Sequence, residues 1–260
     1  MLAKEPSQTA RRVAAQRLTF QRVEVSYGDP QADDRLAGDV ARGLSPGDSP
    51  LRAYLQGRTR FFDTIVVDAI KAGIGQILVG AAGYDGRAWR YSKPGVTWFE
   101  VDHPSTQRDK LSRLESLGIE TSHVRFIAAD FAVDPIAAPV IQSGFAPSQA
   151  ASFLLEGVAV YLNRAVLESV LREFRDLAAP GSILAISLSA STGAPGASER
   201  RSRFQSAVEA MGEPALTTVE PHQVDPLLSA TGWRRRTPPG SDSGGHARRV
   251  AAGFITAEPA

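Results

Sequence analysis

Small and acidic residues follow two apolar segments of the chain and could together hold a nucleoside. Gly80 and Gly83 lie in a turn at residues 80–87, where the lack of side chains lets a ligand approach the backbone. Asp102 closes the next apolar run about twenty residues later, where Rossmann-like folds accept hydrogen bonds from ribose hydroxyls. A tight strand-to-helix turn would explain the glycines equally well. The spacing also fits a nicotinamide dinucleotide, but the turn does not spell G-x-G-x-x-G.

Two further acids end apolar runs. Glu156 lies within the run FLLEGV, where an unpaired carboxylate would cost free energy, so we expect it to face a cation. Asp130 and Phe131 follow a third run, and Asp130 alone would pass as a helix cap or a solvated acid. Of the four histidines, only His222 lies in a region that could line a substrate pocket. The others are His103, His123 and His246.

Short strands alternating with helices are needed to position these groups. This alternation demands parallel pairing with right-handed crossovers, and the last two apolar pieces suit an antiparallel hairpin. We expect an α/β fold: a doubly wound, mostly parallel seven-stranded sheet with helices on both faces and a C-terminal antiparallel hairpin. Strands are expected at residues 76–81, 96–101, 124–128, 151–155, 182–188, 233–237 and 250–256, and helices at 51–72, 105–117, 164–178, 197–211 and 222–230.

An N-terminal arm precedes this pattern. Apolar residues alternate with arginines at residues 1–25, which predicts an amphipathic helix, either solvated or closing over the pocket as a lid. We therefore expect a helical arm at residues 1–50 and a catalytic domain at residues 51–260.

Composition limits the partners. The 260 residues carry 29 Lys and Arg against 28 Asp and Glu, so no global field favours nucleic acid or anionic lipid. The absence of cysteine excludes disulfides, thiolate metal sites and a cysteine nucleophile, and no metal is expected. No stretch approaches the ~20 apolar residues that cross a bilayer. We expect a cytoplasmic monomer or homodimer that acts on a small molecule.

Four motifs, in order, resemble the leucine carboxyl methyltransferase family. They are RTRFFD at residues 58–63, AGYDGRAWR at 82–90, FEVDHP at 99–104 and EGVAVYL at 156–162. The resemblance covers roughly residues 51–190, and the wording of the second motif is most similar to the bacterial branch that includes polyketide carboxyl O-methyltransferases. It implies a class I methyltransferase fold with S-adenosyl-L-methionine as donor and S-adenosyl-L-homocysteine as product.

The resemblance also implies roles for individual residues. Arg60 would hold the donor's α-carboxylate through two charge-assisted hydrogen bonds. The turn that contains Gly83 and Asp85, with Gly80 as the second glycine, would pass under the methionine part. The other expected donor contacts are Asp102 on the ribose, Asp130 and Phe131 on the adenine, and Glu156 on the ammonium group. One departure is Ala81, which stands where many relatives have glycine.

The methyl acceptor follows from acid–base chemistry. A carboxylate acceptor, with a pKa near ~4, is ionised at neutral pH, whereas a phenol near ~10 needs a general base. His222 is the candidate base, but it has no readable partner, which favours a carboxylate. Tyr161 would contact donor or acceptor, or only pack in the core.

Several functions remain open from the sequence. The leading hypothesis is methylation of a small-molecule carboxylate or hydroxyl, such as that of a polyketide. The alternative is esterification of a peptide or protein C-terminal carboxylate. A nicotinamide-dependent dehydrogenase and an inactive binding protein are further alternatives.

Overall fold

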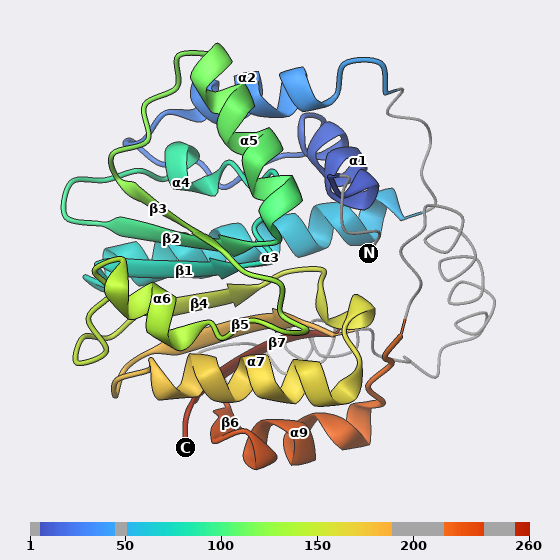
Figure 1. The fold of residues 1–260 in the computed structure, drawn as a ribbon, viewed down its shortest axis with the longest axis vertical. Coiled ribbons are helices and arrows are strands. Elements are labelled where there is room, and N and C mark those ends of the chain that lie inside the picture. Colours follow the sequence, from blue (N-terminus) through green and yellow to red (C-terminus); the bar gives the residue numbers. More distant parts are fainter. Residues whose placement is uncertain (1–5, 45–50, 189–215, 237–252) are drawn as a thin grey trace. The chain divides into compact units, whose positions relative to one another are not determined.

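The computed structural model describes residues 6–44, 51–188, 216–236 and 253–260 (Figure 1). Contacts between residues divide the chain into two compact units, Met1–Asp130 and Phe131–Ala260. The division at residue 50 that the sequence suggests is thus not the division between compact units, and a separate role for residues 1–50 stays a prediction.

Three parallel strands form the sheet of the first unit. Strand β2 pairs with β1 from Gln76↔Thr97 to Gly80↔Val101, and with β3 from Trp98↔Val124 to Asp102↔Ala128. Because parallel strands end at the same edge, this register brings Gly80 and Asp102 to one edge of the sheet. The strands are β1 Gln76–Gly80, β2 Thr97–Asp102 and β3 Val124–Ala128.

The described residues of the first unit also form five helices (Figure 1). The sequence analysis missed α2, although its start carries clear signals: the Asp29 carboxylate accepts from the Ala32 N–H at 2.9 Å, and Pro30 takes the first turn. Leu36 and Val40 then bury one face of this otherwise polar helix. The helices are α1 Gln8–Arg17, α2 Pro30–Val40, α3 Arg52–Lys71, α4 Arg87–Arg90 and α5 Pro104–Ser116.

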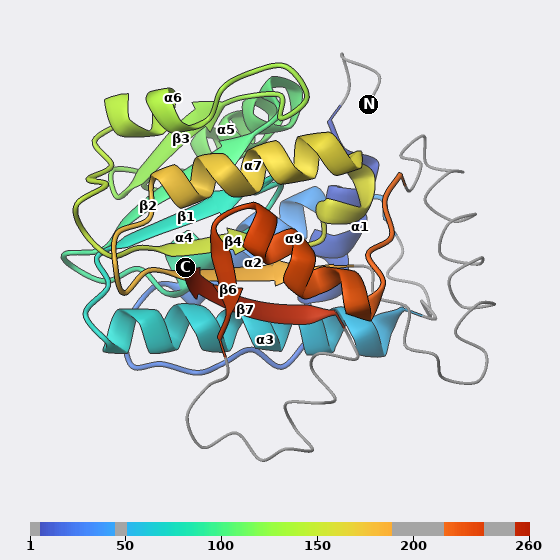
Figure 2. The same cartoon turned by 90° about the horizontal axis from the view of Figure 1, so that it is seen from below.

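The described residues of the second unit form four strands, which pack against an aromatic cluster. Strands β4 and β5 are parallel, whereas β7 pairs antiparallel with both β5 and β6. The ring of Phe153 on β4 lies 5.5 Å from Phe174 and 5.9 Å from Trp233, whose indole donates to the Leu171 carbonyl at 2.8 Å. Both views show α9 beside α7 (Figures 1 and 2). The elements are β4 Ser152–Leu155, β5 Ile183–Ser187, β6 Trp233–Arg235, β7 Phe254–Pro259, α6 Ala137–Gln142, η1 Ala159–Tyr161, α7 Arg164–Asp176, η2 Pro221–Gln223 and α9 Val224–Ala230.

The strand order β3-β2-β1-β4-β5-β7-β6 confirms the expected fold class, a mostly parallel seven-stranded sheet with a C-terminal antiparallel pair. The last strand ends at Pro259 rather than at residue 256. The helix expected at residues 197–211 lies outside the described residues. Among the helices that the structure describes, none is long and apolar enough to cross a membrane.

Candidate functional site

Asp102 lies at the carboxyl end of β2 with both carboxylate oxygens held by backbone amides. Its Oδ1 accepts from the His103 N–H at 2.6 Å, and its Oδ2 accepts a short hydrogen bond from the Gly83 N–H. Burial raises the pKa of Asp102, and the two amide hydrogen bonds oppose that shift. Each oxygen keeps a further lone pair, so the carboxylate can accept two hydroxyl hydrogen bonds from a ribose diol.

The turn after β1 takes a left-handed backbone at two positions. Gly83 has φ +53°, and Ala81 has φ +52°, which is uncommon for a residue with a side chain. A glycine at position 81 would adopt this conformation without strain, and this chain carries the strain of an alanine instead. A Cβ added at Gly83 would lie 3.1 Å from the Cβ of Ala10.

Helix α1 covers this turn. Besides the contact of Ala10, the Ser7 N–H donates to Thr106 Oγ1 at 3.2 Å, and Arg17 Nη2 lies 3.8 Å from Asp85 Oδ2. The arm continues into Arg22, whose side chain is buried. Residues 6–22 therefore pack within the first unit over the carboxyl edge of its sheet, and the lid role stays a prediction.

Asp85 is used by a charged network beneath the turn. Its carboxylate pairs with Arg87 Nη1 at 2.5 Å, and Arg87 Nε pairs with Asp63 Oδ1 at 2.7 Å. Asp63 also accepts from Arg22 Nε at 2.7 Å and Nη2 at 3.0 Å. Burial alone would raise the pKa of Asp63, but Arg87 and Arg22 lower it to about 2. Asp85 thus holds the turn in shape, and a direct contact with a ligand stays a prediction.

A second buried ion pair ties the turn to α5. Lys110 Nζ donates to Glu100 Oε2 at 2.6 Å and to the Asp85 carbonyl at 2.7 Å. Burial raises the pKa of Glu100 to about 7, and the Lys110 ammonium opposes the shift. Both side chains are almost fully buried, so this pair fixes the turn against β2 and α5.

Arg58 and Arg60 lie on opposite sides of helix α3. Arg60, the expected ligand of the donor carboxylate, is exposed, whereas Arg58 is only 8% exposed and its guanidinium lies 5.8 Å from the ring of Tyr54. Residues that are two positions apart along a helix point about 200° apart around its axis, because one turn takes about 3.6 residues. Helical phase predicts this difference in burial: Arg58 lies three residues after the buried Leu55 and four before the buried Phe62, and a donor contact by either arginine stays a prediction.

Four expected site residues belong to the second unit. Glu156 directly follows β4 and is partly buried, not fully as the apolar run suggested. Tyr161 ends η1 with its side chain partly buried, and Phe131, just after Asp130, is also partly buried. His222 lies in η2 and is exposed. His246 lies outside the described residues.

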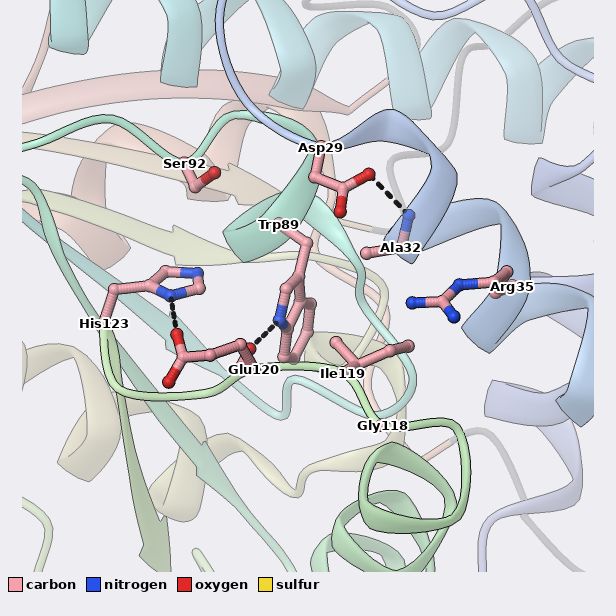
Figure 3. Close-up of a pocket in the computed structure, with 9 residues that line it drawn as sticks. All are labelled: Asp29, Ala32, Arg35, Trp89, Ser92, Gly118, Ile119, Glu120 and His123. Atoms are coloured by element: carbon pink, nitrogen blue, oxygen red, sulfur yellow. Dashed lines mark hydrogen bonds and ion pairs between the residues drawn. The ribbon is translucent and has the colours of Figure 1, made fainter.

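A pocket of about 320 Å³ lies elsewhere in the first unit (Figure 3). The Trp89 indole donates to the Glu120 carbonyl at 2.7 Å, and His123 Nδ1 lies 3.8 Å from Glu120 Oε2. Ser92 and His123 come before β2 and β3, so the pocket lies at the amino ends of these strands, away from Asp102. No expected site residue lines it. The lining residues are Asp29, Ala32, Arg35, Trp89, Ser92, Gly118, Ile119, Glu120 and His123.

Metal ligands are not clustered in the parts of the chain that the structure describes: no group of three or more His, Asp or Glu could hold an ion there. The contacts of Asp102 and of the turn after β1 place the candidate site at the carboxyl edge of the first unit's sheet. It consists of that turn, Asp102 and the residues after β3.

Comparisons with known proteins agree with this architecture. A protein of Mycobacteroides abscessus, predicted to be an S-adenosyl-L-methionine-dependent methyltransferase, is 39% identical over 136 residues, which are 52% of this chain and 45% of that protein. A protein of Mycobacterium avium with the same description is 32% identical over 207 residues, covering 75% of this chain and 65% of that protein. In both, the match spans less than two thirds of the relative's length.

A solved structure shows the same fold. The crystal structure of a predicted methyltransferase from Thermobifida fusca YX matches with a TM-score of 0.60 at 22% identity, covering 98% of this chain and 94% of that chain. A match to the leucine carboxyl methyltransferase family spans residues 9–175, which are more than half of the sequence and include the turn after β1, Asp102 and the residues after β3. On this match, and with the four motifs in the expected order, the chain belongs to the leucine carboxyl methyltransferase family.

Proposed function

We propose that the protein is an S-adenosyl-L-methionine-dependent O-methyltransferase. The observation that carries this proposal is Asp102, held by the Gly83 and His103 amides at the carboxyl edge of the sheet with lone pairs left for a ribose diol. When bound, the donor supplies an electrophilic methyl group on a sulfonium. The protein itself must bind the donor and the acceptor, align the acceptor oxygen with the methyl group, and exclude water from the site. Family membership leaves the dehydrogenase alternative without support.

Calorimetric titration with S-adenosylhomocysteine tests the donor site. We expect micromolar binding by the wild type and a loss of at least about tenfold in Asp102→Asn, since an amide cannot accept two hydroxyl hydrogen bonds on two oxygens. Glu120→Gln, a change of the same kind at the pocket of Figure 3, serves as the control and should bind as the wild type does. Failure of the wild type to bind would refute the proposal.

We further propose that Arg58, rather than Arg60, holds the donor's carboxylate. The attraction between a guanidinium and a carboxylate is stronger where water is largely excluded. Arg58 is buried whereas Arg60 is exposed, so Arg58 is better placed to bind the carboxylate. Glu156 remains the proposed partner of the donor's ammonium group, since it directly follows β4 and is shielded in part from water.

Two ligands that differ in their amino-acid part test this assignment. Arg58→Met should weaken S-adenosylhomocysteine by about 10- to 100-fold, because a hydrogen bond to a charged group contributes about 1.5–3 kcal/mol. It should leave 5′-methylthioadenosine, which lacks the carboxylate, nearly unchanged. Arg60→Met is the matched control. The assignment fails if Arg60→Met shows the selective loss instead.

The acceptor we propose is a small-molecule carboxylate, such as that of a polyketide. This chemistry needs no general base, and it agrees with the exposed position of His222. A screen with donor labelled in the methyl group should transfer label to aromatic carboxylic acids in preference to matched phenols. Label on peptide C-termini instead would favour the alternative, a peptide or protein carboxyl methyltransferase.

A further inference from the structure

His103 directly follows β2, beside the point where the ends of β2 and β3 meet at the candidate site. Its backbone amide donates to Asp102 at the end of β2, and the Ala129 N–H, just after β3, donates to the Asp102 carbonyl at 2.9 Å. Its ring reaches the same gap: Nε2 lies 3.9 Å from Asp130 Oδ2. The imidazole is largely buried, at 16% exposure, and Asp130 is 44% exposed.

The other ring nitrogen fixes the tautomer. His103 is the N-cap of α5, and its Nδ1 accepts from the Ser105 N–H at 3.3 Å, with Ser105 Oγ at 2.7 Å. A nitrogen that accepts from a backbone amide carries no proton, so the neutral ring has its proton on Nε2. The Nε2–H donor is therefore the atom that faces the Asp130 carboxylate.

From this geometry we infer that His103 is a positioning residue that orients Asp130 to read the donor's base. His103 Nε2 lies 3.9 Å from Asp130 Oδ2 and its N–H attracts that oxygen electrostatically, which leaves the other oxygen to accept from the exocyclic amino group of adenine. The inference rests on the proposed function, which supplies the nucleoside. It predicts that His103 affects the choice of purine rather than binding in general, because the ribose is held by Asp102.

The two functions of the ring can be separated by two substitutions. Asn at position 103 keeps a short side-chain acceptor that can cap α5, but it cannot reach Asp130. Gln has the length to reach Asp130 with an N–H group but is a poor N-cap. His103→Asn should thus retain thermal stability and lose base discrimination, whereas His103→Gln should do the reverse.

The experiment measures dissociation constants by calorimetry for S-adenosylhomocysteine and its 6-oxo counterpart, S-inosylhomocysteine, on the full chain. We expect the wild type to prefer the adenosyl ligand by more than about tenfold and His103→Asn to lower that ratio at least about fivefold. His103→Gln should keep the ratio within about twofold of the wild type. Asp130→Ala, which removes the acceptor itself, should lower the ratio at least as much as His103→Asn does.

The outcomes separate the inference from the proposed function. A wild type that binds neither ligand overturns both. A wild type that prefers the adenosyl ligand, with an unchanged ratio in His103→Asn, overturns the inference alone. Equal loss of both ligands in His103→Asn likewise overturns it, because that result shows a purely structural role.

Discussion

Substitution of Asp63 by Asn tests whether the acids of the first two motifs support the fold rather than bind a ligand. The Asp63 carboxylate is fully buried and accepts three hydrogen bonds, two from Arg22 and one from Arg87, at 2.7 to 3.0 Å. An amide of the same shape offers one acceptor oxygen and turns an NH₂ group toward a guanidinium. The new NH₂ group and an arginine N–H group, both hydrogen-bond donors, then face each other in a fully buried site.

Two estimates give the size of the effect. Breaking a buried pair by removing one partner costs about 3–5 kcal/mol. Each arginine keeps a second carboxylate, since Arg22 lies 3.0 Å from Asp33 and Arg87 lies 2.5 Å from Asp85. Independently, a pKa of about 2 against the ordinary 3.8 means that protonating Asp63 costs the folded state about 2 kcal/mol. We expect Asp63→Asn to lower the free energy of unfolding by about 3 kcal/mol.

Urea denaturation at pH 7.5, followed by far-ultraviolet circular dichroism, measures this loss. The control is Asp34→Asn, which removes a carboxylate that pairs with Arg90 but is 58% exposed and should change stability by less than about 1 kcal/mol. Because the folded pKa of Asp63 is depressed, its contribution is complete above the unfolded value and is lost as the pH falls from about 4 to about 2. A loss below about 1 kcal/mol, or an equal loss in the control, would refute the reasoning.

Four further variants probe the turn and its cover. Ala81→Gly should raise the free energy of unfolding by up to about 1 kcal/mol in thermal or urea denaturation, because relief of the left-handed strain slightly exceeds the entropy that glycine adds to the unfolded chain. Gly83→Ala should lower it by about 1–2 kcal/mol and weaken donor binding in calorimetry, since its Cβ would crowd Ala10. Lys110→Met should destabilise by about 3–5 kcal/mol at pH 8 and less at pH 5, because Glu100, whose pKa is already raised by burial, is then protonated in the folded state; equal losses at the two pH values would contradict this. Removal of residues 1–18, which takes away α1 but keeps Arg22, should raise the Michaelis constant for the donor severalfold, and unchanged kinetics would count against a lid.

The five parallel strands could be predicted from the sequence almost to the residue, whereas the last strand was expected at residues 250–256 and ends at Pro259. The apolar run at residues 124–128 is β3 itself, and the run at 76–81 exceeds β1 by one residue. Strands covered on both faces need apolar residues at nearly every position, so they stand out from their surroundings. Helix α2 was missed for the opposite reason: it buries few large apolar side chains, and its signals are capping residues rather than a periodic stripe.

The sequence by itself determined the succession of strands along the chain, the family and the placing of Asp102 at the end of a strand, because local apolar patterns and motif spacing fix these features. Only the tertiary structure decided which charged residues face a ligand. Asp85 and Asp102 both lie in motif segments, yet Asp85 pairs with Arg87 and Arg17 while Asp102 is held by backbone amides. The partner Arg17 comes from a distant helix, and local sequence does not specify which distant charge will pack against a given acid.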